Sequence, residues 1–182
     1  MAATPSNMIP LGTLAPAFRL ENVNGGWIDF DPETGKPEGN GFIICFICNH
    51  CPFVKHVESE LILIAKDAEE RGIRIFAISS NDVEKYPDDA PELMAEKNYP
   101  FPYLYDESQE VAKAYDAACT PDFYLFDAEY RLVYRGQMDG SRPGNDLPVD
   151  GRDLRAAIKA LLSEEPPLKN QLPSIGCNIK WK

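Results

Sequence analysis

The segment from Cys45 to Pro52 carries the side chains of this sequence that are best suited to chemistry. It reads Cys45-Phe-Ile-Cys48-Asn49-His50-Cys51-Pro52. Two thiols separated by two residues across the first turn of a helix can close a disulfide with little rearrangement, and the thiolate is the reactive form. We therefore predict thiol–disulfide chemistry, with Cys48 as the attacking thiolate and Cys51 as the thiol that resolves a mixed disulfide.

The flanking pattern places this motif where a buried strand leads into a helix. Residues 41–48 are apolar on both alternating faces, as in a strand that is buried on both sides. From Pro52 the apolar residues follow helical spacing as far as Arg71-Gly72. A thiol at the first helical turn faces unpaired N–H groups and the positive end of the helix dipole, so we expect a lowered pKa for Cys48. His50 and Lys55 can add positive charge nearby.

The rest of the chain predicts one α/β layer sandwich in a single domain, residues 1–182, with a core of about 14–163. Asn24-Gly25-Gly26 has the chemistry of a hairpin turn, and residues 31–40 form a loop rich in Gly, Pro and acidic side chains. Residues 164–182 are expected to form an irregular tail. The predicted strands are 18–20, 27–30, 73–79, 123–126 and 132–136, and the predicted helices are 90–98, 108–116 and 151–163.

Length and charge exclude several classes of protein. The chain has 182 residues and a formal net charge of −11, and this acidity argues against a nucleic-acid partner. The longest nearly apolar run, 41–48, is far shorter than the roughly 20 residues of a membrane helix. The first residues lack a basic region followed by an apolar stretch, so no signal peptide is predicted and we expect a reducing, cytoplasmic location. In such a compartment, clustered cysteines indicate metal or redox chemistry more often than structural disulfides.

The acidic residues are unevenly distributed. Nine acidic residues and two lysines lie between Asp82 and Glu110, which accounts for seven of the eleven net negative charges. We interpret this stretch as a solvated helix face with loops, and a docking surface for a basic partner is the alternative.

The cysteine motif, at the junction of a buried strand and a helix, resembles that of the thioredoxin-fold redoxins. This superfamily contains thioredoxins, peroxiredoxins and TlpA/ResA-type thiol reductases. The resemblance covers about residues 14–162 and includes Ala15-Pro-Ala-Phe-Arg-Leu20 and Thr120-Pro121 before a strand. The run from Cys48 to Lys55 and the tail 173–181 are similar to an uncharacterised group of bacterial peroxiredoxin-like proteins. The resemblance implies a three-layer α/β/α sandwich with a central mixed sheet and an N-terminal hairpin extension. It also implies that Pro121 is cis and that Thr120 and Pro121 face Cys48.

The sequence departs from two patterns of this superfamily. Thioredoxins have Trp before the first cysteine and a buried acid six positions before it, whereas this chain has Ile47 and Phe42, so no internal base is evident for Cys51. Peroxiredoxins carry Pro, Thr and Cys spaced as PxxxTxxC. Neither Cys48 nor Cys51 has that spacing, which argues against an efficient peroxidase.

The residue before the second cysteine is His50, a placement shared with protein disulfide isomerase and the bacterial disulfide-forming oxidases. A cation beside Cys48 stabilises the reduced form of the pair. We therefore expect a redox couple that is more oxidising than that of thioredoxin.

Several other residues are candidates for the site. Thr120, Pro121, Asn49 and Arg142 are expected to shape a substrate groove, with Arg142 and Asp139 either at its rim or in a turn. Cys45 is interpreted as a core residue because it lies inside the buried strand. Cys119 is either a packing residue or an auxiliary redox thiol. Cys177 is the second possible auxiliary thiol. It could pair with Cys119 or close over the Cys48–Cys51 pair.

The function predicted from these residues is thiol–disulfide exchange. It would need no bound cofactor, only a protein or small-molecule disulfide as substrate and an unidentified thiol electron donor, such as a thioredoxin or glutathione system. No nucleic-acid or membrane partner is expected, and the chain is expected to be a monomer or a weak homodimer. Two alternatives remain open. One is a weak peroxide-reducing antioxidant protein, and the other is a non-catalytic docking or metal-binding module, with zinc on Cys45, Cys48, Cys51 and Cys177.

Overall fold

The centre of the protein is a seven-stranded mixed sheet. The computed structural model describes residues 3–35 and 39–182, so residues 36–38 of the predicted loop 31–40 lie outside the described residues. The strand order is β3-β2-β6-β5-β4-β8-β9. The strands are β2 (Phe18–Asn22), β3 (Trp27–Phe30), β4 (Gly41–Phe46), β5 (Ile73–Ser79), β6 (Tyr103–Tyr105), β8 (Asp122–Asp127) and β9 (Leu132–Gly136).

Strand β4 lies in the middle of this sheet and is buried on both faces, as predicted. It runs parallel to β5 and antiparallel to β8. Ile43 and Cys45 enter one apolar cluster, while the alternate residues Phe42, Ile44 and Phe46 enter another on the opposite face. This alternation follows from the period of two along a strand. The residues that follow β4 are therefore held at the end of a rigid element.

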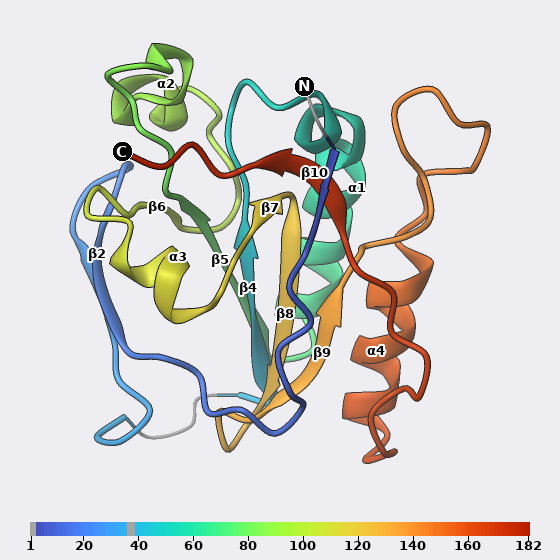
Figure 1. Ribbon diagram of the computed structural model, residues 1–182. Helices are drawn as coiled ribbons and strands as arrows, with labels where there is room; N and C mark the ends of the chain where they lie inside the picture. Colours follow the sequence, from blue (N-terminus) through green and yellow to red (C-terminus); the bar gives the residue numbers. More distant parts are fainter. Residues whose placement is uncertain (1–2, 36–38) are drawn as a thin grey trace.

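Helices cover both faces of the sheet (Figure 1). Helices α1 (Pro52–Glu69) and α4 (Arg152–Leu162) contribute to the cluster on one face, and α3 (Glu110–Ala114) contributes to the cluster on the other. The short helices η1 (Pro87–Asp89) and α2 (Pro91–Ala95) lie at one end of the molecule. The expected three-layer α/β/α sandwich is therefore confirmed, and the hairpin β2–β3 forms one edge of its central sheet.

Helix α1 begins directly after the cysteine motif. Cys51 is its N-cap residue, with an extended backbone and no side-chain capping hydrogen bond, and Pro52 occupies the first helical position. Proline suits that position because its missing N–H would have no helical partner there. The helix buries Val54, Val57 and Leu61, and ends at Glu69 shortly before Gly72. The predicted helix is confirmed, and it sets Cys51 at the positive end of an 18-residue helix.

The C-terminal tail is not irregular throughout, and this prediction was wrong for residues 175–178. Strand β10 (Ile175–Asn178) lies between β1 (Ala3–Pro5) and β7 (Cys119–Thr120) in a separate three-stranded sheet. Figure 1 shows this strand crossing the same end of the molecule as the start of α1. Strands this short carry little periodicity, and each pairs with a segment far away in the sequence. No local pattern could therefore identify them.

The other differences from the predicted elements are small. Strand β6 was not predicted because it follows a proline-rich turn and has only three residues. The helices expected at 90–98 and 108–116 are shortened to α2 and α3. Within the described residues, none of the helices is both long and apolar enough to cross a membrane.

Gly176 is the point of closest approach between β10 and the backbone of Thr120. A Cβ atom on Gly176 would lie 2.0 Å from the Thr120 carbonyl oxygen. We predict that Gly176→Ala displaces β10 and destabilises the protein by about 1–3 kcal/mol, the usual cost of overpacking. Chemical denaturation would measure this loss. Hydrogen exchange should accelerate at the Ile179 amide, which donates to the Ala118 carbonyl oxygen at 3.1 Å.

Gly140→Ala is the matched control for this substitution. A Cβ atom on Gly140 would meet only the Cδ1 atom of Leu147, an exposed side chain that can move away. We expect this variant to retain the stability and exchange rates of the unmodified chain. Unchanged exchange at Ile179 in Gly176→Ala would contradict the contact described here.

Candidate redox site

Cys48 and Cys51 lie at the junction of β4 and α1, against the strand that contains Thr120. Both cysteines are buried, with exposed fractions of 1% and 0%. The Cys48 Sγ atom is 3.4 Å from the Thr120 Oγ1 atom, and the Cys51 Sγ atom is 3.2 Å from the Thr120 carbonyl oxygen. The Thr120–Pro121 peptide bond is cis. The contacts and the cis bond are those implied by the resemblance to redoxins.

Cys177 joins this pair through the tail strand. Its Sγ atom lies 2.7 Å from the Cys51 Sγ atom, and Cys51 also forms a side-chain hydrogen bond with Cys48. The three thiols therefore form a row with Cys51 at its centre. Of the two partners that the sequence left open for Cys177, the structure selects the Cys48–Cys51 pair.

Cys119 belongs to the other side of the small sheet. In the β7–β10 ladder Cys177 is opposite Thr120, whereas Cys119 is opposite Asn178. Adjacent residues of a strand point to opposite faces, so Cys119 points away from the row of thiols. Its Sγ atom lies 3.7 Å from the Pro121 carbonyl oxygen, and burial raises its pKa. These features favour the packing role over the auxiliary redox role.

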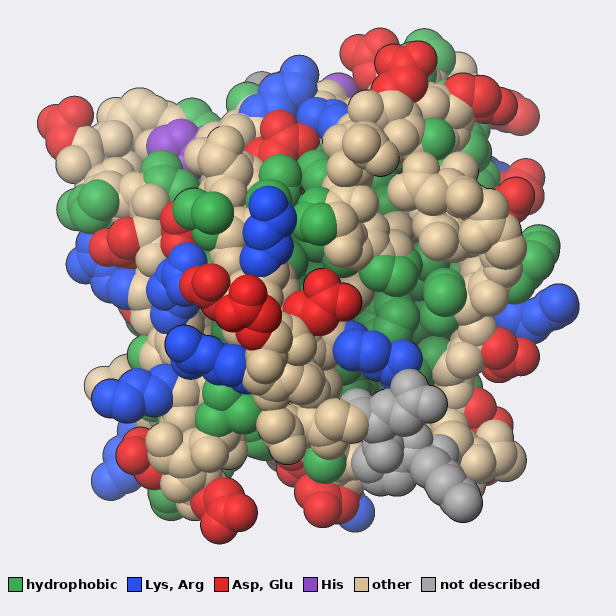
Figure 2. Space-filling view, turned by 180° about the vertical axis from the view of Figure 1, so that it is seen from behind, with side chains coloured by type: hydrophobic (Ala, Val, Ile, Leu, Met, Phe, Trp, Pro, Cys, Tyr) green, Lys and Arg blue, Asp and Glu red, His purple; other side chains and the backbone are tan. Residues whose placement is uncertain are grey.

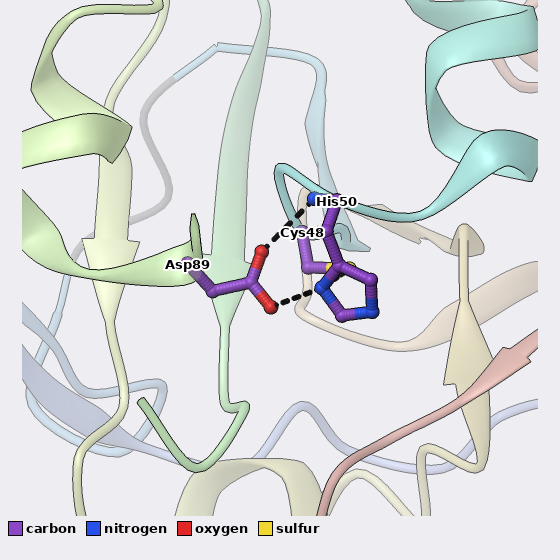
Figure 3. Close-up of side chains that lie close together, drawn as sticks. All are labelled: Cys48, His50 and Asp89. Carbon is purple, nitrogen blue, oxygen red and sulfur yellow. Dashed lines mark hydrogen bonds and ion pairs between the residues drawn. The ribbon is translucent and has the colours of Figure 1, made fainter. Parts of the chain in front are cut away.

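Asp89 is the site residue that the sequence analysis missed. Its side chain is fully buried at the end of η1, and it contacts the loop between the two cysteines (Figure 3). One carboxylate oxygen accepts hydrogen bonds from the backbone amides of Asn49, at 2.7 Å, and His50, at 3.1 Å. The other lies 2.6 Å from His50 Nδ1 and accepts from Asn81 Nδ2 at 2.8 Å. Together, these hydrogen bonds offset the large free-energy cost of burying a charged side chain.

The position of Asp89 corrects the interpretation of the acidic stretch. Asp82, Asp89 and Asp106 are buried, so this stretch is not simply a solvated face. Asp106, for example, accepts a hydrogen bond from the backbone amide of Ala112 near the start of α3. The remaining acids include exposed residues that gather over η1 and α2, at the upper right of Figure 2: Glu84, Asp88, Glu92 and Glu96. The spacing of the acidic residues in the sequence does not distinguish the buried acids from the exposed ones.

The pKa values of Cys48 and Cys51 are shifted in opposite directions. The pKa of Cys48 is raised, first by its hydrogen bond to Cys51, then by burial and by the charge of Asp89. The pKa of Cys51 is lowered, chiefly by its hydrogen bonds with Cys177 and Cys48. The expectation of a lowered pKa for Cys48 was therefore wrong for the closed, reduced site. Helix geometry favours a thiolate here as predicted, but the N-cap residue that benefits is Cys51.

His50 lies close to Cys48, but it is already paired with an acid. Its Nδ1 atom is 3.9 Å from the Cys48 Sγ atom, while the Asp89 carboxylate is much closer. The ring also stacks on that of Tyr86, with 5.4 Å between the ring centroids. The Asp89 carboxylate is therefore the nearer partner of the His50 ring, and the Cys48 sulfur is the more distant one.

Cys48, His50 and Asp89 also offer a sulfur, a nitrogen and an oxygen within 4.8 Å of one another, which is a spacing suited to a metal ion. The nitrogen and the oxygen are, however, hydrogen-bonded to each other, so an ion would have to break that contact. In the part of the chain that the structure describes, Cys45, Cys48, Cys51 and Cys177 do not form a group of this kind. The geometry thus favours thiol chemistry over the zinc site considered from the sequence.

The remaining predicted groove residues have structural partners. Asn49 donates its side-chain amide to the Asp88 carbonyl oxygen and accepts a hydrogen bond from the Tyr103 hydroxyl group, so it supports the loop. Arg142 lines a small hollow together with Pro121, and it donates to Gln137 and to nearby backbone carbonyl oxygens.

Asp139 is buried and accepts hydrogen bonds from Ser141 and from the backbone amides of Asp150 and Gly151. These contacts give it the turn role, next to the start of α4.

Comparisons with known proteins identify the family and the fold of this chain. The family model described as "AhpC/TSA family" matches residues 11–135. The crystal structure of an uncharacterised conserved protein from Geobacillus kaustophilus is 55% identical, with a TM-score of 0.94, and the match covers 100% of this chain and 97% of that one. A hypothetical protein from Sinorhizobium meliloti is 45% identical, with a TM-score of 0.93, and 98% of each chain is covered.

More distant structures share the fold. A candidate thiol:disulfide interchange protein DsbE from Chlorobium tepidum is 19% identical, with a TM-score of 0.66, and the match covers 85% of this chain and 99% of that one. Among curated proteins, no sequence matches this chain.

The buried charge of Asp89 generates a prediction about Cys48. Asp89→Asn keeps a side-chain oxygen for the amides of Asn49 and His50 but removes the negative charge. We expect the pKa of Cys48 to fall, because a nearby anion disfavours a thiolate. The pH dependence of Cys48 alkylation, followed by peptide mass spectrometry, measures this shift.

Asp88→Asn is the control, since the side chain of Asp88 is exposed and only its backbone oxygen binds Asn49. This variant should titrate like the unmodified chain. A Cys48 pKa that is the same in Asp89→Asn and Asp88→Asn would show that the Asp89 charge does not reach the thiol.

Proposed function

The chain belongs to the AhpC/TSA family, and on that premise we propose that it is a thiol–disulfide oxidoreductase whose redox pair is Cys48 and Cys51. Family membership supports an oxidoreductase function in general. The observation that carries the specific proposal is the pair of thiols at the N-terminus of α1, both in contact with Thr120 beside the cis Pro121. A thiol pair in this setting can exchange electrons with a disulfide without any bound cofactor.

The first step is attack by Cys48 on a substrate disulfide. The raised pKa of Cys48 and the lowered pKa of Cys51 favour Cys51 as the thiolate of the reduced site. As the Cys48 sulfur bonds to one substrate sulfur, its proton passes to Cys51, and the other substrate sulfur leaves as a thiolate. Cys51 thus takes up the proton that Cys48 releases during the attack.

The second step releases the reduced substrate. The departing thiolate takes the proton from Cys51, and the restored Cys51 thiolate attacks the Cys48 sulfur of the mixed disulfide. A Cys48–Cys51 disulfide forms, the second substrate sulfur leaves as a thiolate, and the substrate has gained two electrons. An external dithiol, such as that of a thioredoxin-like donor in a reducing compartment, would return the pair to the dithiol state.

Thr120 supports this exchange from the opposite wall of the site. Its hydroxyl group contacts Cys48 and lowers the pKa of that thiol, against the effects of Cys51 and Asp89. Its carbonyl oxygen faces Cys51. One residue therefore contacts both sulfurs. This position is compatible with the proposed role of Thr120 and Pro121 in shaping a substrate groove beside the two cysteines.

We predict that Cys51→Ser stops turnover at the mixed disulfide. Without a resolving thiol, Cys48 should remain bound to half of a small disulfide such as oxidised glutathione. Intact-mass spectrometry would show an adduct of one glutathione per chain, and peptide mapping would place it on Cys48. Cys48→Ser should give neither the adduct at this position nor steady-state reduction of the disulfide.

Cys45→Ala is a suitable control, because Cys45 is buried within β4 as a core residue. It should keep disulfide turnover and the fold, as judged by circular dichroism. Retention of turnover by Cys48→Ser would refute the proposed role of Cys48. Treatment of the same variants with hydrogen peroxide tests the alternative, since rapid sulfenic acid formation on Cys48 without disulfide turnover would favour a peroxide-reducing protein.

A further inference from the structure

We propose that Cys177 is a third redox thiol of this site, which takes over the disulfide by attacking Cys51 and so returns Cys48 to the reduced state. This inference rests on the proposed function and deepens it. The resting oxidised form of the protein would then contain a Cys51–Cys177 disulfide, and Cys48 would remain free.

The row of thiols is the first support. The 2.7 Å between the Sγ atoms of Cys51 and Cys177 approaches the bond length of a disulfide, which is about 2.0 Å. Cys51 also contacts Cys48, so both of its neighbours are candidates for the same bond. Cys177 is 1% exposed, as is Cys48, so burial alone does not separate the roles of these two thiols. The contact that does is the one between the Sγ atoms of Cys177 and Cys51.

The tail holds Cys177 at this position from both sides. Before the cysteine, Ser174 donates its hydroxyl group to the Gly136 carbonyl oxygen at 2.7 Å, and its backbone exchanges hydrogen bonds with Ser6. After it, the backbone of Lys180 accepts from Gln109 at 2.9 Å and donates to Asn81 at 2.9 Å. Between these anchors, β10 is paired with β1 and β7. Fixed geometry of this kind raises the effective concentration of the thiol at its target.

The proposed step conserves atoms and electrons. It starts from the Cys48–Cys51 disulfide that the proposed function produces. The Cys177 thiolate attacks the Cys51 sulfur, a Cys51–Cys177 bond forms, the Cys48–Cys51 bond breaks, and Cys48 leaves as a thiolate. No electron enters or leaves the protein, because the disulfide substrate was the oxidant in the preceding step. The proton released by Cys177 is available to Cys48 or to solvent.

The charges around Cys177 favour this order of events. In the reduced site its pKa is raised, first by the hydrogen bond to Cys51, then by burial and by the charge of Cys51. Oxidation of Cys51 removes the first and the third of these causes. Lys180, which lowers the pKa of Cys177, remains in place. Cys177 is thus held in the protonated form until Cys51 is oxidised.

The same exchange changes the state of Cys48. Its hydrogen bond to Cys51 is the largest cause of its raised pKa, and the Cys51 charge adds to it. Both disappear when Cys51 is bonded to Cys177. The product is therefore a chain in which the tail is covalently tied over the site while Cys48 is a more acidic thiol than before.

Disulfide mapping of the full-length chain tests this inference. The reduced protein is treated with one equivalent of oxidised glutathione, quenched with acid, alkylated and digested. We expect a peptide pair linked through Cys51 and Cys177, with the alkyl label on Cys48. A Cys48–Cys51 linkage as the main product in the unmodified chain would overturn the proposal.

Variants separate this inference from the proposed function. Cys177→Ser should shift the linkage to Cys48–Cys51 and protect Cys48 from alkylation. Cys119→Ser is the matched control, because Cys119 is the buried neighbour on the opposite face of the same ladder, and it should keep the Cys51–Cys177 linkage. If Cys177→Ser leaves the labelling of Cys48 unchanged, Cys177 has no part in exchange.

If Cys48→Ser turns over disulfides, the proposed function fails instead. Circular dichroism and thermal unfolding of Cys177→Ser and Cys177→Ala test whether each variant remains folded. Two replacements are used because a polar and an apolar side chain are not expected to disturb the buried position equally.

Discussion

The antiparallel pairing of β10 with β7 is the constraint on which the rest of the site depends. It sets Cys177 opposite Thr120, and it closes the end of the molecule at which β4 passes into α1. An exposed sheet edge is a ready template for another strand, and here the chain covers that edge with its own tail. As a result, the sulfur atoms of Cys48, Cys51 and Cys177 are all shielded from solvent. The pairing also explains why Gly176 must lack a side chain, because the Thr120 carbonyl oxygen occupies that space.

Burial makes the charges of this site interdependent. Water cannot screen the Cys51 thiolate or Asp89, so each affects the protonation of its neighbours strongly. The site uses hydrogen bonds to distribute the charge: two thiols lie against Cys51, and backbone amides with Asn81 and His50 surround Asp89. The hydrogen bond from Cys48 to Cys51, burial and the charge of Asp89 together raise the pKa of Cys48, although this thiol is placed beside a helix N-terminus.

Much of the fold followed from periodicity in the sequence. The both-sided burial of β4, the apolar face of α1 and the hairpin β2–β3 each depend on residues that are neighbours in the chain, so a local pattern was enough to identify them. The small sheet of β1, β7 and β10 offered no such pattern. Strands β1 and β10 are more than a hundred residues apart, and β1 and β7 are only three and two residues long. Strands of that kind are stabilised by their partners rather than by their own composition.

The sequence by itself indicated the chemical type of the site, because two thiols spaced as Cys48 and Cys51 before a helix have few other uses. The resemblance to redoxins implied that Thr120 and Pro121 lie beside them. Only the tertiary structure decided in which direction each thiol pKa is shifted, which acid contacts the motif and which further cysteine joins the pair. The physical reason is that a pKa or a sulfur–sulfur contact depends on distances of a few ångströms in a buried environment. The packing of η1 and β10 brings Asp89 and Cys177 within that distance of His50 and Cys51. The spacing of these residues in the sequence does not predict either contact.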